Sequence, residues 1–172
     1  MSPFGMFHTA VSVLPIAFGL VAFARYGGID PKTRAGKWYL LTMLAGSVSS
    51  WWFIATKGFN PAQVLTLITL ALLAIGTLTL RGAWRGPGHV QTLALSASYL
   101  LLMVFATTET LTRVPLGQPF ATGPADPALL PVRLALLTAF VVGVGYQVMQ
   151  LRAKNGPEAR LERIMAEYRR AA

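Results

Sequence analysis

The sequence predicts an all-α integral membrane protein with five transmembrane helices in an up-and-down bundle. Of the 172 residues, 54% are hydrophobic and only 12% are charged, about half the charged fraction of a typical soluble domain. Long uncharged stretches alternate with short segments that hold nearly all the Lys and Arg. Five such stretches leave too little polar surface to cover a soluble core, so lipid is the solvent that fits.

Five stretches approach the length of about 20 mostly apolar residues that a transmembrane helix needs. The expected spans are residues 8–24, 38–56, 61–80, 89–108 and 134–151. Asn60-Pro61 and Gly86-Pro87-Gly88 mark breaks between them, because Gly, Pro and Asn favour turns. Residues 1–152 therefore form the expected transmembrane domain. The proline-rich segment 115–131 is expected to be an external loop.

Residues 153–172 are expected to form a basic cytoplasmic tail with an amphipathic helix. Asn155 lies where a helix cap is expected, and Pro157 fits a first helical turn. One face of this helix holds Leu161, Ile164, Met165 and Tyr168. Such a helix lies on the inner leaflet, docks on a partner, or is solvated, and the sequence leaves these alternatives open.

The positions of the Lys and Arg residues predict the orientation. If the N-terminus is outside, all but three of the 15 Lys and Arg residues face the cytoplasm, as the positive-inside rule requires. The exceptions are Lys57, Arg113 and Arg133. We therefore expect a multi-pass protein of the bacterial inner membrane with its C-terminus in the cytoplasm. Because most of the cations border apolar segments, the net charge of +9 favours anionic lipids as partners and argues against nucleic acid.

Several kinds of chemistry lack the residues that they need. The chain has no cysteine, which excludes disulfides, thiolate metal sites and cysteine nucleophiles. The central part of each expected span contains no Asp, Glu, Lys or Arg. Ion pumps and proton-coupled carriers rely on such groups, so their absence argues against both classes. With no phosphate loop, nucleophile triad or paired carboxylates, an enzyme is not expected.

Three residues near the span ends are candidates for a polar or ligand site. His8 and Glu109 are expected at the same depth on the outer side, where imidazole and carboxylate can bond, bind a cation or pass a proton. His89 is expected on the inner side. Two histidines a membrane thickness apart do not ligate one haem iron, although a single axial histidine remains an alternative. The simpler interpretation is that all three are interfacial residues without a metal.

Small residues recur at four-residue intervals on two expected spans. Gly46 and Ser50 form one such pair, and Ala94 and Ser98 form another. Small residues let membrane helices approach closely, and Ser can bond across the contact. We therefore predict that these residues pack helices together, with a polar ligand cleft as the alternative.

Several of these residues resemble a pattern in a family of uncharacterised bacterial membrane proteins, classified as a domain of unknown function. His8 and Gly19 resemble its first element, Gly36 and Tyr39 part of its second, and His89 its last. The resemblance spans roughly residues 8 to 113 and implies a compact four-helix membrane core. The chain departs from the family pattern at Lys32, where the family has a histidine. The resemblance implies no particular activity.

These observations predict a non-enzymatic subunit or accessory protein of a larger inner-membrane assembly. Its partners would be lipids and either another membrane protein or a second copy of itself. The alternative is a membrane redox protein that binds haem, quinone or a pigment through His89, or through His8 with Glu109. A small-molecule transporter is a third alternative.

Overall fold

The computed structural model describes residues 3–54, 58–59, 61–78 and 87–156, together with positions 165 and 169. These residues form five α-helices and two short 3₁₀ helices, with no strand among them. The α-helices are α1 (Pro3–Tyr26), α2 (Arg34–Ser50), α4 (Pro61–Leu78), α5 (Pro87–Leu111) and α6 (Leu130–Asn155). The 3₁₀ helices are η1 (Trp51–Phe53) and η3 (Pro127–Leu129). The expected all-helical class is confirmed.

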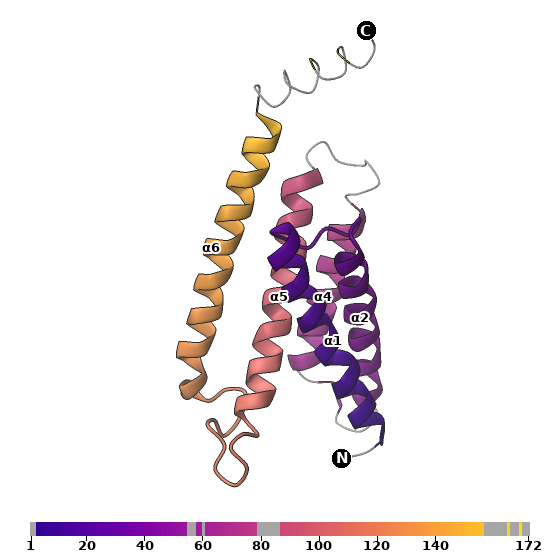
Figure 1. The fold of residues 1–172 in the computed structure, drawn as a ribbon. Helices are drawn as coiled ribbons and strands as arrows, with labels where there is room; N and C mark the ends of the chain where they lie inside the picture. The colour runs from indigo at the N-terminus through magenta and orange to yellow at the C-terminus, as the bar shows by residue number, and fades with distance from the viewer. Residues whose placement is uncertain are drawn as a thin grey trace.

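Consecutive α-helices run in opposite directions (Figure 1). The turn between α1 and α2 lies at the same end of the molecule as the C-terminal part of α6, and we call this the basic end. The N-terminal part of α1 lies at the other end, together with residues 112–126 between α5 and α6, and we call this the loop end. The helices therefore cross the molecule alternately.

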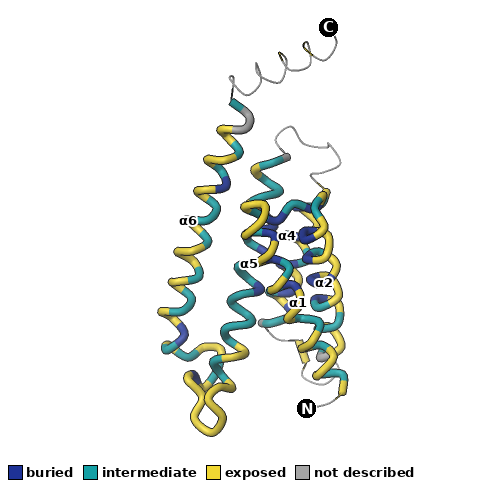
Figure 2. The backbone as a smooth tube through the Cα atoms, in the orientation of Figure 1, coloured by how far each residue is buried: buried dark blue, intermediate teal, exposed yellow. Residues whose placement is uncertain are grey.

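Four of the helices form a closed ring, and the fifth lies outside it. α1 packs on α2, α2 on α4, α4 on α5, and α5 back on α1. α6 packs on α5. Figure 2 shows the buried residues gathered inside the four-helix ring, whereas α6 is mostly exposed or intermediate along its length. The arrangement is a four-helix bundle with one appended helix.

The core of the ring combines aliphatic, aromatic and small residues. Tyr39 and Leu95 have no exposed surface. Gly76 allows α4 to approach α5, because a Cβ atom at this position would lie 2.6 Å from Leu95 Cδ2. Because Leu95 is fully buried, glycine at position 76 leaves the space that its side chain needs against the α4 backbone.

The turn between α1 and α2 is built from local hydrogen bonds. The Asp30 backbone oxygen accepts from the Thr33 backbone N at 3.0 Å and from the Thr33 hydroxyl at 2.8 Å. The Thr33 hydroxyl in turn accepts from Gly36 N at 3.0 Å, which satisfies one of the free N–H groups at the start of α2. These bonds fix the direction in which α2 returns along α1.

Three helical segments are long and apolar enough to span a membrane: Pro3–Tyr26, Gly88–Leu111 and Pro127–Ala153. The expectation of five spans is therefore not supported. The apolar part of α4, Ala62–Leu78, is shorter than these three. α2 has only 17 residues, with Arg34 and Lys37 in its first turn. Helix formation and spanning length are separate requirements, and within the described residues α2 and α4 are shorter than the three candidate spans.

The observed helices differ from the expected spans at their ends. α1 begins at Pro3 rather than residue 8, and α6 begins at Leu130 rather than residue 134. A helix continues as long as its backbone bonds can form, so its ends need not coincide with those of the apolar stretch. The expected tail helix lies outside the described residues apart from Met165 and Arg169, which are helical.

The segment between α5 and α6 is held by the carboxylate of Asp126. Its Oδ2 accepts from the Thr122 backbone N at 2.7 Å and the Thr122 hydroxyl at 2.8 Å, and its Oδ1 accepts from Ala128 N at 2.9 Å. The backbone hydrogen bond from Thr122, followed by those from Ala128 N and the Thr122 hydroxyl, lowers the pKa of this carboxyl. Each bond favours the charged form.

This loop should therefore loosen in acid. A group whose pKa is lower in the folded state stabilises the fold above its unfolded pKa, about 3.9 for Asp, and loses that contribution as the pH falls through the folded value. We expect protection of the Thr122 and Ala128 amides against hydrogen exchange to fall below about pH 4. In Asp126→Asn, protection should already be reduced at pH 7 and change little with acid. Equal protection in both proteins at pH 7 would contradict this role.

Candidate functional site

His8 links α1 to α2 near the loop end. Its Nδ1 lies 2.8 Å from the Ser49 hydroxyl, and its Nε2 lies 3.5 Å from the Ser12 hydroxyl on the next turn of α1. Gly46 lies one turn before Ser49, and a Cβ atom at that position would lie 3.3 Å from Ser12 Oγ. The small residues of α2 thus bring its backbone close enough to α1 for the His8 bond to form.

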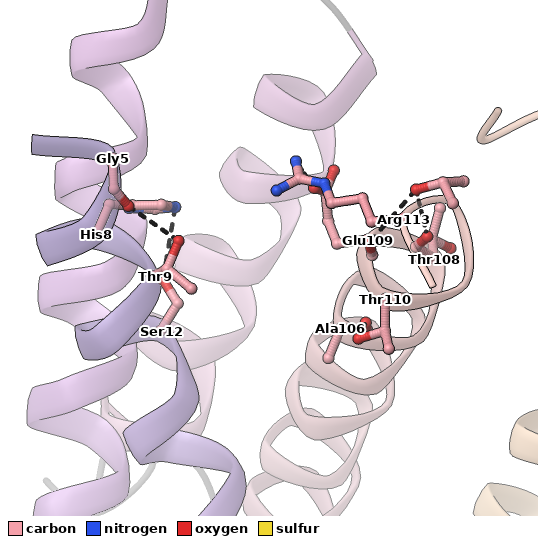
Figure 3. Close-up of polar contacts among 10 residues, drawn as sticks. Gly5, His8, Thr9, Ser12, Ala106, Thr108, Glu109, Thr110 and Arg113 are labelled. Carbon is pink, nitrogen blue, oxygen red and sulfur yellow. Dashed lines mark hydrogen bonds and ion pairs between the residues drawn. The ribbon is translucent and has the colours of Figure 1, made fainter. Parts of the chain in front are cut away.

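Glu109 lies at the end of α5 and forms an ion pair with Arg113, one turn further on. The His8 ring and the Arg113 guanidinium both point into the space between α1 and α5 (Figure 3). The charge of Glu109 acts on the His8 ring. The structure therefore brings His8 and Glu109 to the same end of the molecule. It also adds Arg113 as the ion-pair partner of Glu109, which the sequence reasoning had not placed in this group.

A row of buried polar residues lines the inner face of α4. Gln63, Thr66 and Thr69 are all buried. The Thr66 hydroxyl lies 3.5 Å from that of Ser50 on α2. Sequence reasoning missed this row, although polar residues at three-residue spacing in an otherwise apolar helix are a recognisable sign of an inward face. Ser50 accordingly faces α4, whereas Gly46 faces α1.

The centre of the bundle holds a fully buried hydrogen bond between α2 and α5. The hydroxyl groups of Tyr39 and Ser98 lie 2.8 Å apart, and neither residue has exposed surface. Ser98 also donates to the Leu95 backbone oxygen at 2.7 Å. This bond satisfies a tyrosine hydroxyl that burial in an apolar core would otherwise penalise. Ala94 is likewise buried.

The basic end contains a second polar link that the sequence reasoning missed. Gln147 of α6 is buried; its Nε2 donates to the Gly27 backbone oxygen at 2.8 Å, and its Oε1 accepts from the Ser96 hydroxyl at 2.9 Å. One amide group thus joins α6 to α5 and to the turn between α1 and α2. The available signal was the position of Gln147 within the apolar stretch 134–151.

His89 lies on the first turn of α5 and is exposed. α1 and α5 begin at opposite ends of the bundle (Figure 1), so His8 and His89, which lie in early turns of these two helices, are far apart. No group of three His, Asp or Glu side chains that could hold a metal ion occurs in the part of the chain that the structure describes. Among the described residues, the arrangement offers hydrogen bonds at both ends, the Glu109–Arg113 ion pair at the loop end, and a neutral, tightly packed centre.

Four of the five residues that carry the family resemblance lie at close contacts. His8 bonds Ser49, Tyr39 bonds Ser98, and Gly19 and Gly36 lie where a Cβ atom would collide with a neighbour. His89 is the exposed exception. The pattern therefore falls mainly on residues that pack the helices rather than on one chemical site.

Replacing His8 with alanine should lower the free energy of unfolding by about 1 kcal/mol, because hydrogen bonds between membrane helices contribute about 0.6 to 2 kcal/mol. Ser49→Ala should have a similar effect. The double variant should have about the same free energy of unfolding as the less stable of the two single variants, since both changes remove the same bond. Unfolding in mixed micelles measures these differences, and fully additive effects would show that the bond contributes nothing.

No family model, no curated protein and no solved structure matches this chain. The resemblance to the uncharacterised membrane family therefore stays a prediction.

Proposed function

We propose that the protein is a non-enzymatic subunit or accessory protein of a larger assembly in the bacterial inner membrane, and that α6 is the helix that meets the partner. The observation that supports this proposal is the small share of α6 that is buried. Only 6% of its spanning window is buried, compared with 17% for α1 and 28% for α5. α6 is thus the long apolar helix that the chain itself covers least.

Two glycines in α6 support a protein rather than lipid as the neighbour. A Cβ atom at Gly143 or Gly145 would meet nothing within 4 Å. Glycine inside a helix costs about 0.5 to 1 kcal/mol relative to alanine. No neighbour within the described residues gives a packing reason for that cost. Close approach of a second membrane helix would supply one, because small residues let two backbones come together.

We further propose that α2 and α4 also cross the membrane, which gives five crossings with the N-terminus outside. They have 17 and 18 residues, a helix length of about 26 Å. A bilayer core of about 30 Å accommodates such helices by local thinning and by snorkelling of flanking residues. Both helices pack within the same ring as α1 and α5. The cations of the basic end then face the cytoplasm, as the charge bias favours.

The test is photo-crosslinking in native membranes with a probe placed on α6. A photoreactive residue replaces Val142, which is 66% exposed and precedes the open glycines. We expect one defined adduct with a different membrane protein. The matched control places the same probe at Leu41 of α2, which is 58% exposed, and should give no such adduct.

A second variant checks that the glycines cause the contact. Gly143→Leu combined with Gly145→Leu should remove the adduct, because bulky side chains keep the helices apart. Adducts with lipid alone, or with a second copy of the chain alone, would contradict a role as a subunit of a larger assembly.

A further inference from the structure

The turn between α1 and α2 concentrates positive charge on one surface. The exposed cations of this turn are Arg25, Lys32, Arg34 and Lys37. Asp30 is the one acidic residue among positions 25–37, and its Oδ1 accepts a hydrogen bond from Lys32 N at 2.8 Å. The carboxylate therefore supports the turn, and the four exposed cations lie within seven positions of it in the sequence.

α6 is held against this cationic turn, although it is distant in sequence. Gln147 bonds the Gly27 backbone oxygen, and a Cβ atom at Gly28 would lie 2.9 Å from Gln147 Nε2. Arg152 follows Gln147 by five residues, about 7.5 Å along the helix axis, and is exposed. The buried amide thus brings a fifth exposed cation to the end of the bundle where the turn lies.

Exposed aromatic and apolar residues lie close to these cations in the sequence. Tyr26, Trp38 and Tyr146 are each about half exposed, and Met149 of α6 is also exposed. Trp38 stacks on Phe18 of α1, with ring centroids 5.9 Å apart. Aromatic residues of this kind lie at headgroup depth in membrane proteins, next to the acyl chains.

We propose that the basic end is a binding site for an anionic phospholipid, formed jointly by the turn between α1 and α2 and the last turns of α6. The cations bind the headgroup phosphate, to which guanidinium groups can donate two parallel hydrogen bonds. The acyl chains lie beside the exposed side chains of Tyr146 and Met149, next to Gln147 on α6. Charge complementarity selects this occupant, because only a lipid supplies both the negative phosphate and the apolar chains.

The proposal differs from general attraction to a charged membrane surface in one respect. General attraction needs only the cations, whereas this site also needs Gln147 to hold α6 beside the turn. It does not depend on a protein partner for α6, so it stands or fails separately from the proposed function.

Lipid binding to the purified full chain in a neutral detergent tests the site. Phosphatidylglycerol and phosphatidylcholine are titrated in turn, and native mass spectrometry counts the bound molecules. We expect one saturable phosphatidylglycerol molecule, bound roughly tenfold more tightly than phosphatidylcholine, since each nearby cation strengthens the attraction. Equal binding of the two lipids would overturn the proposal.

Charge variants then distinguish binding at this site from general attraction by the net charge of the protein. Arg25→Gln combined with Arg152→Gln should weaken phosphatidylglycerol binding by roughly tenfold or more. The control, Arg113→Gln with Arg133→Gln, removes the same charge at the loop end and should leave binding unchanged. Equal weakening in both variants would mean a nonspecific charge effect and would overturn the proposal. Inorganic phosphate that competes as well as the lipid would also overturn it, because the acyl chains would then contribute nothing.

The contribution of α6 is tested with Gln147→Leu, which keeps every cation. This variant should bind phosphatidylglycerol several-fold more weakly, whereas Gln150→Leu, which loses only an exposed bond to Tyr146, should bind normally. If Gln147→Leu fails to fold, Arg152→Gln alone serves as the second test. If the variant that folds, Gln147→Leu or else Arg152→Gln, binds phosphatidylglycerol as tightly as the parent protein, α6 is not part of the site.

Discussion

Replacing Gly36 with alanine should destabilise the protein by about 3 kcal/mol, the upper part of the usual range for overpacked sites. The added Cβ atom would lie 1.9 Å from the Asp30 backbone oxygen and 2.5 Å from its carbonyl carbon. Backbone atoms cannot swing aside as a flexible side chain does. The Asp30 oxygen also accepts two hydrogen bonds from Thr33, so moving it breaks the turn that starts α2.

Unfolding of the purified protein in mixed micelles measures this effect. Gly145→Ala is the matched control, because a Cβ atom there meets nothing within 4 Å. The control should be as stable as the parent protein or more stable by up to about 1 kcal/mol, the helix propensity gained over glycine. If Gly36→Ala were as stable as the control, the turn at Asp30 would not pack on the first turn of α2 as closely as the structure has it.

Replacing Gly19 with alanine should lower the free energy of unfolding by about 2 kcal/mol. The added Cβ atom would lie 2.2 Å from Tyr99 Cε2 and 2.6 Å from its Cδ2. The Tyr99 ring has little freedom to move, because it packs against Phe23 at 5.2 Å and Tyr39 at 6.1 Å between ring centroids. α1 and α5 must therefore separate, or the aromatic group must rearrange.

A second change distinguishes this collision from other effects of alanine. Tyr99→Leu in the Gly19→Ala background removes the ring that collides, so it should recover part of the lost stability. The same Tyr99→Leu change in the parent protein should be destabilising, because it removes the ring contacts and the bond from the Tyr99 hydroxyl to the Ile16 backbone oxygen at 3.3 Å. Equal losses in both backgrounds would contradict a clash between Gly19 and Tyr99. Gly143→Ala is the control for the higher helix propensity of alanine, because a Cβ atom at Gly143 meets nothing within 4 Å.

The number of helices and their approximate positions could be predicted from the sequence. An apolar stretch is a property of consecutive residues, so each of the five α-helices covers most of one expected span. The number of membrane spans was harder to predict than the positions of the helices. α2 places Arg34 and Lys37 in its own first turn, and the sequence alone did not indicate that the helix would begin among those charges.

The candidate site was likewise predicted only in part from the sequence. Sequence reasoning identified His8 and Glu109 as residues at one depth, because depth follows from position along a span. It did not identify Ser49 as the neighbour of His8, nor Gln147 as the residue that joins α6 to Gly27, 120 positions earlier. Sequence by itself determined that this chain forms apolar helices with its cations concentrated toward one end. Only the tertiary structure decided which polar groups pair, because pairing depends on how helix faces rotate and approach one another. Small residues such as Gly19 and Gly46 set that approach through contacts with Tyr99 and Ser12, which are distant in the chain.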